Sequence, residues 1–379
     1  MDISDYRKTI DEIDDNLTKL FCKRMEVAEK IASYKKANGM PVLDATRERQ
    51  LLNKVSKTAG EEFGEYTRIL YNTIMSLSRS YQSKKLQSDS ALSDSIKNAI
   101  ASTPQLFPTR AKVACQGIEG AYSQKACDKL FTLPQVEYVP TFENVFEKVE
   151  KGECEYGIVP LENSTAGSVN QTYSLLTKHD FYIVRSLKMQ INHSLLAPRG
   201  VKLEDIKEIF SHEQAINQCS EFIRSLNGVK VTVCANTAMS AQKVAKEGRR
   251  DACAIASIDC ASAYGLEVIK DKIANTDSNF TKFICISKNL QIYPGANRTS
   301  IVLSTANKPG ALYGILSRLT ALGINVIKLE SRPIEGRDFE FTFYFDLDVS
   351  VYSPSLLQLV SELERDVDSF RYLGSYSEN

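Results

Sequence analysis

The sequence predicts a multidomain chain: an all-helical segment, then an α/β segment, then a ferredoxin-like βαββαβ unit. Three observations support this prediction. Apolar residues within 3–36 recur at spacings of three and four, which is typical of a helix. Short apolar runs alternate with helical segments across 111–287, and residues 298–379 read as strand, helix, strand, strand, helix and strand. A chain of 379 residues is expected to contain two or three domains at the usual ~100–200 residues each.

Two segments have the composition of linkers. Residues 89–110 are rich in serine and contain two prolines, with only a weak helical pattern. Residues 288–297 contain Pro294 and Gly295 between two strand-like runs. We therefore expect domains at 1–88, 111–287 and 298–379.

Composition excludes several classes of protein. The 47 Lys and Arg balance the 47 Asp and Glu, so no overall charge favours nucleic acid or an anionic membrane. No run of ~18 apolar residues occurs, and the polar start does not resemble a signal peptide, so no membrane partner is expected. The nine cysteines form no CxxC pair and are odd in number, which favours reduced thiols in a cytoplasmic protein. The three histidines lack metal-ligand spacing, and we expect neither a metal site nor a cofactor.

An arginine interrupts the apolar stripe of the first helical segment. Arg24 occupies a position at which the repeat calls for an apolar residue, and Arg7 and Lys35 lie beside the stripe. A snorkelling arginine at the edge of the seam is one interpretation. However, a helix over 3–36 is about 51 Å long, whereas a compact 90-residue monomer is only ~30 Å across, so the helix needs a partner. The simplest partner is a second copy of the chain.

An antiparallel dimer of this helix would create an anion site. Arg7 and Arg24 of one chain lie about 25 Å apart along the axis, too far to hold one small molecule. In the dimer, Arg7 of one chain meets Arg24 and Lys35 of the other. Because unpaired buried charge is costly, such a cluster favours a small dianion.

Two further helices are predicted in the first block. VLDATRERQLLNKV follows Pro41, with Asp44 near its start and Glu48 in its first turns, and residues 65–86 place Ser78 and Gln82 four apart on one face. On YRKTIDEID, CKRMEVAEKIASYKK, PVLDATRERQLL and LSRSYQ, this block resembles the all-helical chorismate mutase domain over essentially its full length. That family rearranges chorismate to prephenate without a metal, cofactor or covalent catalyst. The reaction needs a clamp for two carboxylates and positive charge near the breaking ether bond.

The resemblance also implies a role for each matching residue. Lys35 and Gln82 would be catalytic at the ether oxygen, and Asp44 and Glu48 would lie near the ring hydroxyl. The residues expected to hold carboxylates are Arg7 from the other protomer, Arg24 and Ser78. Arg47 is interpreted as a solvated residue.

In the middle block, four apolar runs end in polar residues. One run leads into Glu162–Asn163–Ser164–Thr165, another into Ser211–His212–Glu213–Gln214, and two more into Thr237 and Ser257. In open α/β sheets, which we expect here to be parallel, ligands bind beyond the carboxyl ends of the strands. Considered by themselves, Thr237 and Ser257 are explained by helix capping. The four consecutive polar residues at 162–165 exceed what one helix cap uses. The glycines of KVACQGIEGAYSQKA match no nucleotide-binding pattern and are interpreted as turn residues.

The middle block resembles prephenate dehydratase on ACQGIEGAYS, YGIVPLENSTAGSV, NHSLLA, SHEQAINQC, AIASIDCASAYGL and NFTKF. The resemblance implies two lobes, built like a periplasmic-type binding protein, with prephenate in the cleft. Prephenate loses carbon dioxide and hydroxide together, so a hydrogen-bond donor is needed near the departing hydroxyl. By similarity that catalytic donor is Thr281, and the substrate-binding residues are Glu162, Asn163, Ser164, Thr165, Ser211, Gln214, Gln218 and Lys282. Lys282 stands where the family usually has arginine and lacks the bidentate fork for a carboxylate. His193 and His212 are interpreted as structural.

The last block carries Pro309–Gly310 just before its first predicted helix, where backbone N–H groups suit a carboxylate. Spacing alone favours a plain turn with nothing bound. NKPGALYGIL and KLESRP resemble the ACT domain of prephenate dehydratases, which implies an L-phenylalanine site. Tyr313 replaces the usual valine. The effector residues implied are Gly310, Ala311, Leu312, Tyr313, Glu330, Ser331, Arg332 and Pro333.

Together these patterns predict a bifunctional enzyme of phenylalanine biosynthesis that converts chorismate to prephenate and then to phenylpyruvate. We expect feedback inhibition by L-phenylalanine and a homo-oligomer, either a dimer or a tetramer. Two alternatives stay open. One is a non-catalytic two-lobed receptor that carries a sensor module, and the other is a dehydratase that prefers arogenate.

Overall fold

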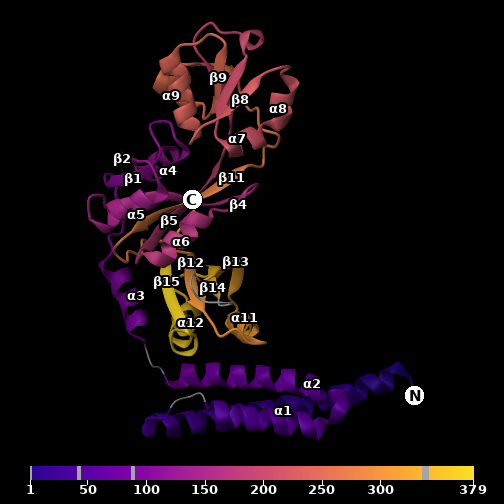
Figure 1. The fold of residues 1–379 in the computed structure, drawn as a ribbon. Coiled ribbons are helices and arrows are strands. Elements are labelled where there is room, and N and C mark those ends of the chain that lie inside the picture. Colours follow the sequence, from indigo (N-terminus) through magenta and orange to yellow (C-terminus); the bar gives the residue numbers. More distant parts are fainter. Residues whose placement is uncertain (1, 41–43, 87–89, 335–340) are drawn as a thin grey trace. The chain divides into compact units, whose positions relative to one another are not determined.

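The computed structural model describes residues 2–40, 44–86, 90–334 and 341–379, and the chain divides into two compact units. Unit 1 contains residues 1–98 and 300–372, and unit 2 contains residues 99–299 and 373–379. Figure 1 shows the elements of both.

Long helices form the first part of unit 1. They are α1 (Ile3–Ala37), α2 (Ala45–Leu86) and the start of α3 (Ala91–Ser102). Asp2 caps the start of α1. Asp2 and Asp5 form a capping box, in which the side chain of each accepts a hydrogen bond from the backbone N–H of the other. At Gly60 (φ 76°, ψ −178°) α2 is interrupted, so it consists of two helices, as the sequence predicts. α3 lies within the segment expected to be a linker, where the helical pattern was weak.

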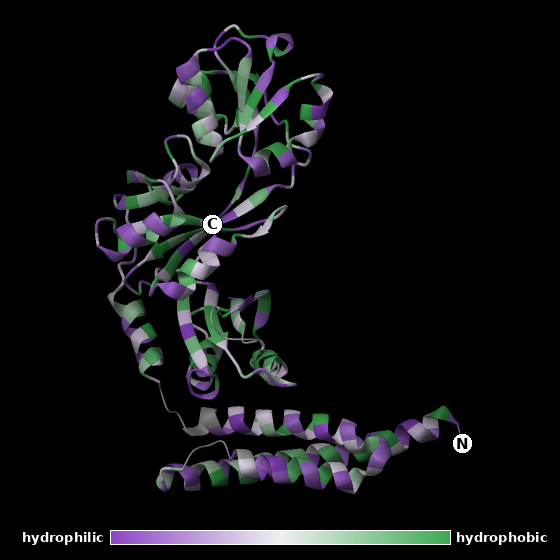
Figure 2. Cartoon of the chain, viewed as in Figure 1, coloured by the Kyte–Doolittle hydropathy of each residue, from purple (hydrophilic) through white to green (hydrophobic). Residues whose placement is uncertain are grey.

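One side of α1 is buried within the chain, whereas the apolar stripe that was predicted to form the seam is exposed. The buried positions of the α1–α2 pair include the small residues Ala28 and Ala32. In contrast, Ile10, Leu17 and Leu20 on the predicted seam are 54%, 54% and 65% exposed. The alternation of apolar and polar colour along α1 is visible in Figure 2. Apolar stripes of this length are seldom left open to water.

The first lobe of unit 2 is a six-stranded sheet with the order β2-β1-β3-β11-β5, and β4 pairs with β3. β1 is parallel to β2 and β3, whereas β11 runs antiparallel to β3 and β5. The sheet is therefore mixed, and the expectation of a parallel sheet was wrong for these strands. The strands are β1 (Lys112–Gln116), β2 (Gln135–Val139), β3 (Tyr156–Asn163), β4 (Gly167–Ser168), β5 (Tyr182–Gln190) and β11 (Phe280–Ser287). The helices are α4 (Tyr122–Leu130), α5 (Phe142–Glu150) and α6 (Asn170–Lys178).

The second lobe of unit 2 is a five-stranded sheet with the order β10-β6-β9-β7-β8. Its strands are β6 (Ser194–Ala197), β7 (Glu208–Ser211), β8 (Lys230–Val233), β9 (Ala252–Ala256) and β10 (Glu267–Lys270). Its helices are η1 (Leu203–Asp205), α7 (Glu213–Gln218), α8 (Ser220–Ser225), α9 (Thr237–Glu247) and α10 (Asp259–Tyr264). Both faces of β9 are buried, because alternate residues enter the core clusters beside α9 and beside α7 and α8. Figure 1 shows α8 and α9 on opposite sides of the strands.

The connections between the two lobes determine where a ligand can bind. The chain enters the second lobe between β5 and β6 and returns between β10 and β11. Because β11 is antiparallel to β3, the beginning of β11 pairs with the end of β3, and Thr281 lies opposite Asn163. The first residues of β11 therefore lie at the edge of the sheet where β3 ends, which is where ligands bind in open α/β sheets.

The remaining elements have the order βαββαβ, as the sequence predicts, and form a four-stranded sheet with the order β13-β14-β12-β15. They are β12 (Arg298–Ser304), α11 (Ala311–Ala321), β13 (Asn325–Pro333), β14 (Phe341–Asp348), α12 (Pro354–Asp366) and β15 (Ser369–Tyr376). Ser353 caps α12 and Pro354 occupies its first turn, where a missing N–H costs nothing. Within the described ranges, no helix combines the length and apolarity needed to span a bilayer.

Candidate active sites

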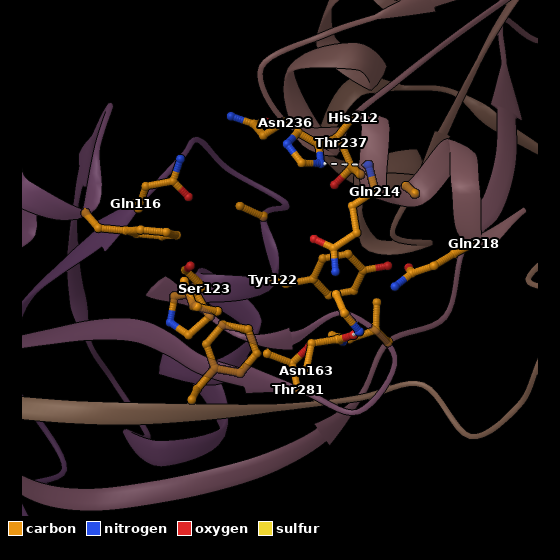
Figure 3. Close-up of a pocket in the computed structure, with 18 of the residues that line it drawn as sticks. Gln116, Tyr122, Ser123, Asn163, His212, Gln214, Gln218, Asn236, Thr237 and Thr281 are labelled. Atoms are coloured by element: carbon orange, nitrogen blue, oxygen red, sulfur yellow. Dashed lines mark hydrogen bonds between the residues drawn. The ribbon is translucent and has the colours of Figure 1, made fainter. Parts of the chain in front are cut away.

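A cavity of about 500 Å³ lies in unit 2 and is lined by both lobes (Figure 3). The first lobe contributes the ends of β1 and β3 and the start of β11, and the second contributes the starts of α7 and α9. Figure 3 shows Asn163 and Thr281 side by side on one wall, with Asn236 and Thr237 across from them. The cavity has the size of a small-molecule site.

The side chain of Asn163 is held in one orientation. Its Oδ1 accepts hydrogen bonds from the backbone N–H groups of Thr165 (3.0 Å) and Ala166 (2.8 Å). Because backbone N–H groups can only donate, the oxygen must face them and the amide nitrogen must face the other way. Nδ2 donates to Asn279 Oδ1 at 2.8 Å and to Thr281 Oγ1 at 2.9 Å.

This arrangement determines what Thr281 can do. Thr281 is 8% exposed and lines the cavity. Its Oγ1 accepts a hydrogen bond from Asn163, so its own hydroxyl proton is available for donation to a ligand. The structure thus presents Thr281 as a hydrogen-bond donor at the cavity wall.

A chain of hydrogen bonds extends from this pair to a buried histidine. Gln218 Nε2 donates to Thr165 Oγ1 at 2.9 Å, which leaves Gln218 Oε1 as an acceptor. That oxygen accepts from Asn279 Nδ2 at 3.0 Å and lies 2.9 Å from His193 Nε2, so the proton of a neutral His193 is on Nε2. Burial lowers the pKa of His193, which keeps the ring neutral. His193 therefore orients Gln218, and both His193 and His212, which were interpreted as structural, line the cavity.

The structure adds polar residues that the sequence did not single out. Gln116 lies at the end of β1, and Tyr122 and Ser123 begin α4. Tyr122 donates through its hydroxyl to the carbonyl of Asn192 at 2.5 Å, and burial raises its pKa. These residues flank the glycines interpreted as a turn. The rule that ligands bind beyond strand ends, applied to the first strand as well, would have found Gln116.

The sequence did not single out Asn236, and it indicated a helix-capping role for Thr237. Asn236 caps α9 by accepting the backbone N–H of Met239 at 2.7 Å, and it lines the cavity as well. Thr237 follows it in the first turn of α9 and also lines the cavity. The start of α9 thus combines capping with a place in the cavity wall.

Not every residue expected at the cleft lies at the cavity wall. Ser211 is fully buried and donates to the carbonyl of Ile255 at 2.7 Å. Ser164 donates to the carbonyl of Ser278 at 2.7 Å and closes the loop after β3. Asn163, Gln214 and Gln218 do line the cavity, and Thr165 lies in an adjacent pocket while bonding to Gln218.

Glu162 and Lys282 occupy the opposite side of the sheet from Asn163 and Thr281. They face each other in the β3–β11 register, one residue along from Asn163 and Thr281. Because successive side chains of a strand point to opposite faces, neither residue lines the cavity. Lys282 instead forms an ion pair with Glu378 at 3.3 Å.

The cavity wall contains histidines but no acidic residue, lysine or arginine among the described residues. Carboxylates entering this cavity would therefore bind to amides, hydroxyls and the backbone N–H groups at helix starts, such as those of α4 and α9.

In unit 1, part of the predicted chorismate site is assembled. Arg24 donates a hydrogen bond to Ser78 Oγ across the α1–α2 pair, and Arg79 forms an ion pair with Glu48. Gln82 is 8% exposed, and its Oε1 has no hydrogen-bond partner in the described part of the chain. A buried amide oxygen of this kind is costly unless a ligand or a second chain pairs with it.

Arg7, Asp44 and Lys35 lie near the ends of the helices to which they belong. Arg7 is exposed on α1, several turns before Arg24, and so cannot join Arg24 in the same chain. Asp44 accepts the backbone N–H of Arg47 at 2.9 Å and caps the start of α2. Lys35 lies in the last turn of α1.

The residues predicted to bind an effector lie on α11 and β13. Gly310 (φ 84°) precedes α11 as its N-cap without a side-chain cap, and Ala311, Leu312 and Tyr313 form its first turn. Tyr313 lies 3.3 Å from Thr73 Oγ1 of α2 through its hydroxyl. The other predicted effector residues are on β13 and are Glu330, Ser331, Arg332 and Pro333. Among them, Arg332 forms an ion pair with Glu330 at 2.8 Å.

The fold and the two sites define an enzyme with a helical domain ahead of a two-lobed α/β domain, whose cleft suits a small carboxylated substrate. Residues 6–83 match the chorismate mutase type II family, and residues 113–291 match the prephenate dehydratase family. The chain belongs to the prephenate dehydratase family and carries a chorismate mutase domain ahead of the dehydratase.

Three known proteins illustrate the similarity. Arogenate dehydratase/prephenate dehydratase 2 of Arabidopsis thaliana is 36% identical over 282 residues, which cover 71% of this chain and 73% of the relative. The bifunctional chorismate mutase/prephenate dehydratase of Escherichia coli is 29% identical over 384 residues, covering 98% and 96%. The prephenate dehydratase of Arthrobacter aurescens, solved with L-Phe, is 28% identical with a TM-score of 0.64, covering 70% of this chain and 89% of that one.

These matches confirm the two predicted activities. The chain is a chorismate mutase and a prephenate dehydratase that acts in the biosynthesis of phenylalanine. The alternative of a receptor without catalytic activity was wrong.

Proposed function

We propose that the unit 2 cavity binds prephenate and that Thr281 donates a hydrogen bond to its departing ring hydroxyl. The observation that carries this proposal is the hydrogen bond from Asn163 to Thr281 Oγ1, because it leaves the threonine proton for the ligand. As the ring carboxylate leaves as carbon dioxide, its bonding electrons enter the ring and hydroxide departs. Charge then develops on the leaving oxygen, where the Thr281 hydroxyl stabilises it.

A wall without an acidic side chain among its described residues favours prephenate over arogenate. Arogenate carries an ammonium group where prephenate has a keto oxygen, and an ammonium removed from water needs an acidic partner. None of the described residues that line the cavity is Asp or Glu. Amide and hydroxyl donors such as Gln214 and Thr237 suit a keto oxygen instead.

The experiment that tests the substrate is a comparison of kcat/KM for the two compounds with the purified full chain. We expect prephenate to be preferred by at least ~10-fold, since each missing counter-ion or hydrogen bond in a buried site costs ~1–3 kcal/mol. Equal values, or a preference for arogenate, would reject this assignment and leave the dehydratase class intact.

In unit 1, chorismate is rearranged in a pocket shared by two chains. Arg24 and Ser78 hold carboxylates, Lys35 and Gln82 face the ether oxygen, Asp44 and Glu48 face the ring hydroxyl, and Arg7 comes from the second chain. The exposed seam of α1 and the unpartnered oxygen of Gln82 support this proposal, because a second helix and a ligand would cover both. Sedimentation velocity of the full chain tests for the dimer or a tetramer built from it.

L-Phenylalanine acts as a feedback inhibitor at an ACT domain formed by residues 298–379. The amino acid binds near Gly310–Ala311–Leu312–Tyr313 and Glu330–Ser331–Arg332–Pro333. The uncapped start of α11 supports this, because its backbone N–H groups suit a carboxylate. The Arthrobacter relative with bound L-Phe supports it as well. Unchanged dehydratase activity and unchanged thermal stability at millimolar phenylalanine would reject it.

The free cysteines support a cytosolic location for the enzyme. All nine cysteines are free, and burial raises the pKa of several, including Cys219 and Cys253 to about 12. Unpaired thiols in this number suit the reducing cytosol, where we place the enzyme.

A further inference from the structure

The segment that follows β15 extends the sheet of the first lobe. Ser186, on the edge strand β5, donates its backbone N–H to the carbonyl of Ser377 at 3.1 Å and accepts the N–H of Asn379 at 2.9 Å. Lys188 donates its backbone N–H to the carbonyl of Asn379 at 3.0 Å. Residues 377–379 thus pair in parallel with β5, with Glu378 opposite Ser186.

This added strand supplies a carboxylate to a crowded pair of lysines. Lys282 of β11 lies directly opposite Lys188 of β5 in the register, and like charges in that position repel. Lys282 has a side chain only 13% exposed, which makes an unpaired ammonium costly. Glu162 of β3 lies opposite Lys282 in the register, Glu378 meets Lys282 at 3.3 Å, and the ring of Tyr376 lies 5.8 Å from its Nζ.

Lys282 lies beside an irregularity in the pairing of β3 with the strand that carries Thr281. The register shifts between Lys282 and Phe283, where β3 has the extra residue Leu161, whereas β11 pairs without a break with β5 from Phe280 to Cys285. A bulge of this kind in β3 can re-aim neighbouring side chains. The ion pair with Glu378 adds a side-chain contact to this region, on the face of the sheet opposite the cavity.

We propose that Glu378 is a positioning residue for the dehydratase: by holding Lys282 it fixes the start of β11 and thereby the direction of the Thr281 hydroxyl. Lys282 accordingly acts from behind the catalytic strand and is not a ligand of the substrate. This inference rests on the proposed role of Thr281 and adds to it a residue that is nearly one hundred positions away in sequence.

The test is a double-mutant cycle in the full chain with Glu378→Gln, Lys282→Met and their combination. We expect each single change to lower kcat on prephenate about three- to tenfold with KM unchanged, because the donor is misaligned while the substrate still binds. The double variant is expected to lose no more than either single variant. Lys282→Arg keeps the charge and is expected to retain kcat. Glu204→Gln is the matched control, since it removes the carboxylate of a pair with Lys202 in which both side chains are 77% exposed.

A structural readout accompanies the kinetics. Hydrogen exchange at the amides of residues 281–283 is expected to accelerate in Glu378→Gln and to stay unchanged in Glu204→Gln. If Lys282→Met does not fold, Glu378→Gln and Lys282→Arg still decide the question.

Three outcomes have different meanings. Full kcat and unchanged exchange in Glu378→Gln would overturn the inference. A raised KM in Lys282→Met, with Glu378→Gln silent, would also overturn it and make Lys282 a substrate ligand. Loss of the proposed function itself would show separately, as a Thr281→Val variant with undiminished dehydratase activity.

Discussion

The amide nitrogen of Asn163 donates a hydrogen bond to the Oγ1 of Thr281 at 2.9 Å, across the antiparallel pairing of β3 and β11. Two backbone N–H groups after β3 hold the Asn163 oxygen, so the amide cannot turn to offer an acceptor instead. The Thr281 hydroxyl therefore accepts a hydrogen bond from the protein and can donate its own hydrogen to a ligand in the cavity.

Replacing that hydroxyl should abolish one activity only. Thr281→Val keeps the shape of the side chain and removes its donor, so we expect kcat on supplied prephenate to fall about 10²- to 10⁴-fold. Thr281→Ser restores the donor and should recover most of the rate. Phenylpyruvate formation measures the loss, and chorismate consumption by the same preparation is the control. Equal losses of both activities in a folded variant would contradict separate sites.

The buried histidine predicts how stability depends on pH. Burial lowers the pKa of His193 in the folded chain, so below pH 6.5 the unfolded chain binds this proton more readily than the folded one. The free energy of unfolding should therefore fall as the pH drops below about 6.5, by at most about 1.4 kcal/mol per pH unit for this group. The fall ends below the folded-state pKa.

A comparison of variants isolates this contribution. His193→Gln keeps a donor for Gln218 without a titrating ring, and urea unfolding between pH 5 and 8 compares it with the unaltered chain. His212→Gln is the matched control, because His212 caps α7 near the same cavity. A pH dependence that survives in His193→Gln would show that other groups cause it.

The sequence could predict which strands end at the site but not which side chains face it. The run Glu162–Asn163–Ser164–Thr165 was expected at the cleft as a block, yet only Asn163 of the four lines the main cavity. Adjacent residues of a strand point to opposite faces, and a one-residue difference in register reverses every choice. Lys282 was expected beside the substrate from the family resemblance, and the same alternation places it on the other face of the sheet. Its partner Glu378 could not be predicted, because no local pattern links it to β11.

Arg24 should be essential to the mutase and irrelevant to the dehydratase. Arg24 meets Ser78 on α2, within unit 1, whereas Thr281 belongs to unit 2. We expect Arg24→Ala to lower chorismate turnover by at least ~10³-fold, since the clamp that orients a substrate carboxylate is lost. Prephenate turnover and its KM should stay within about twofold of the unaltered chain. A parallel loss of dehydratase activity would show that the two sites depend on each other.

The exposed seam of α1 leads to a complementation test of the shared mutase pocket. Arg7→Ala and Arg24→Ala chains should each be inactive as mutases, because every pocket of either dimer lacks one arginine. After the two are unfolded together and refolded, half of the dimers are mixed, and each mixed dimer has one pocket that combines an intact Arg7 with an intact Arg24. We therefore expect about one quarter of the mutase activity to return. Refolding each variant alone is the control. If the mixture stays inactive while dehydratase activity recovers fully, Arg7 does not act across two chains, and the exposed stripe of α1 needs a different partner.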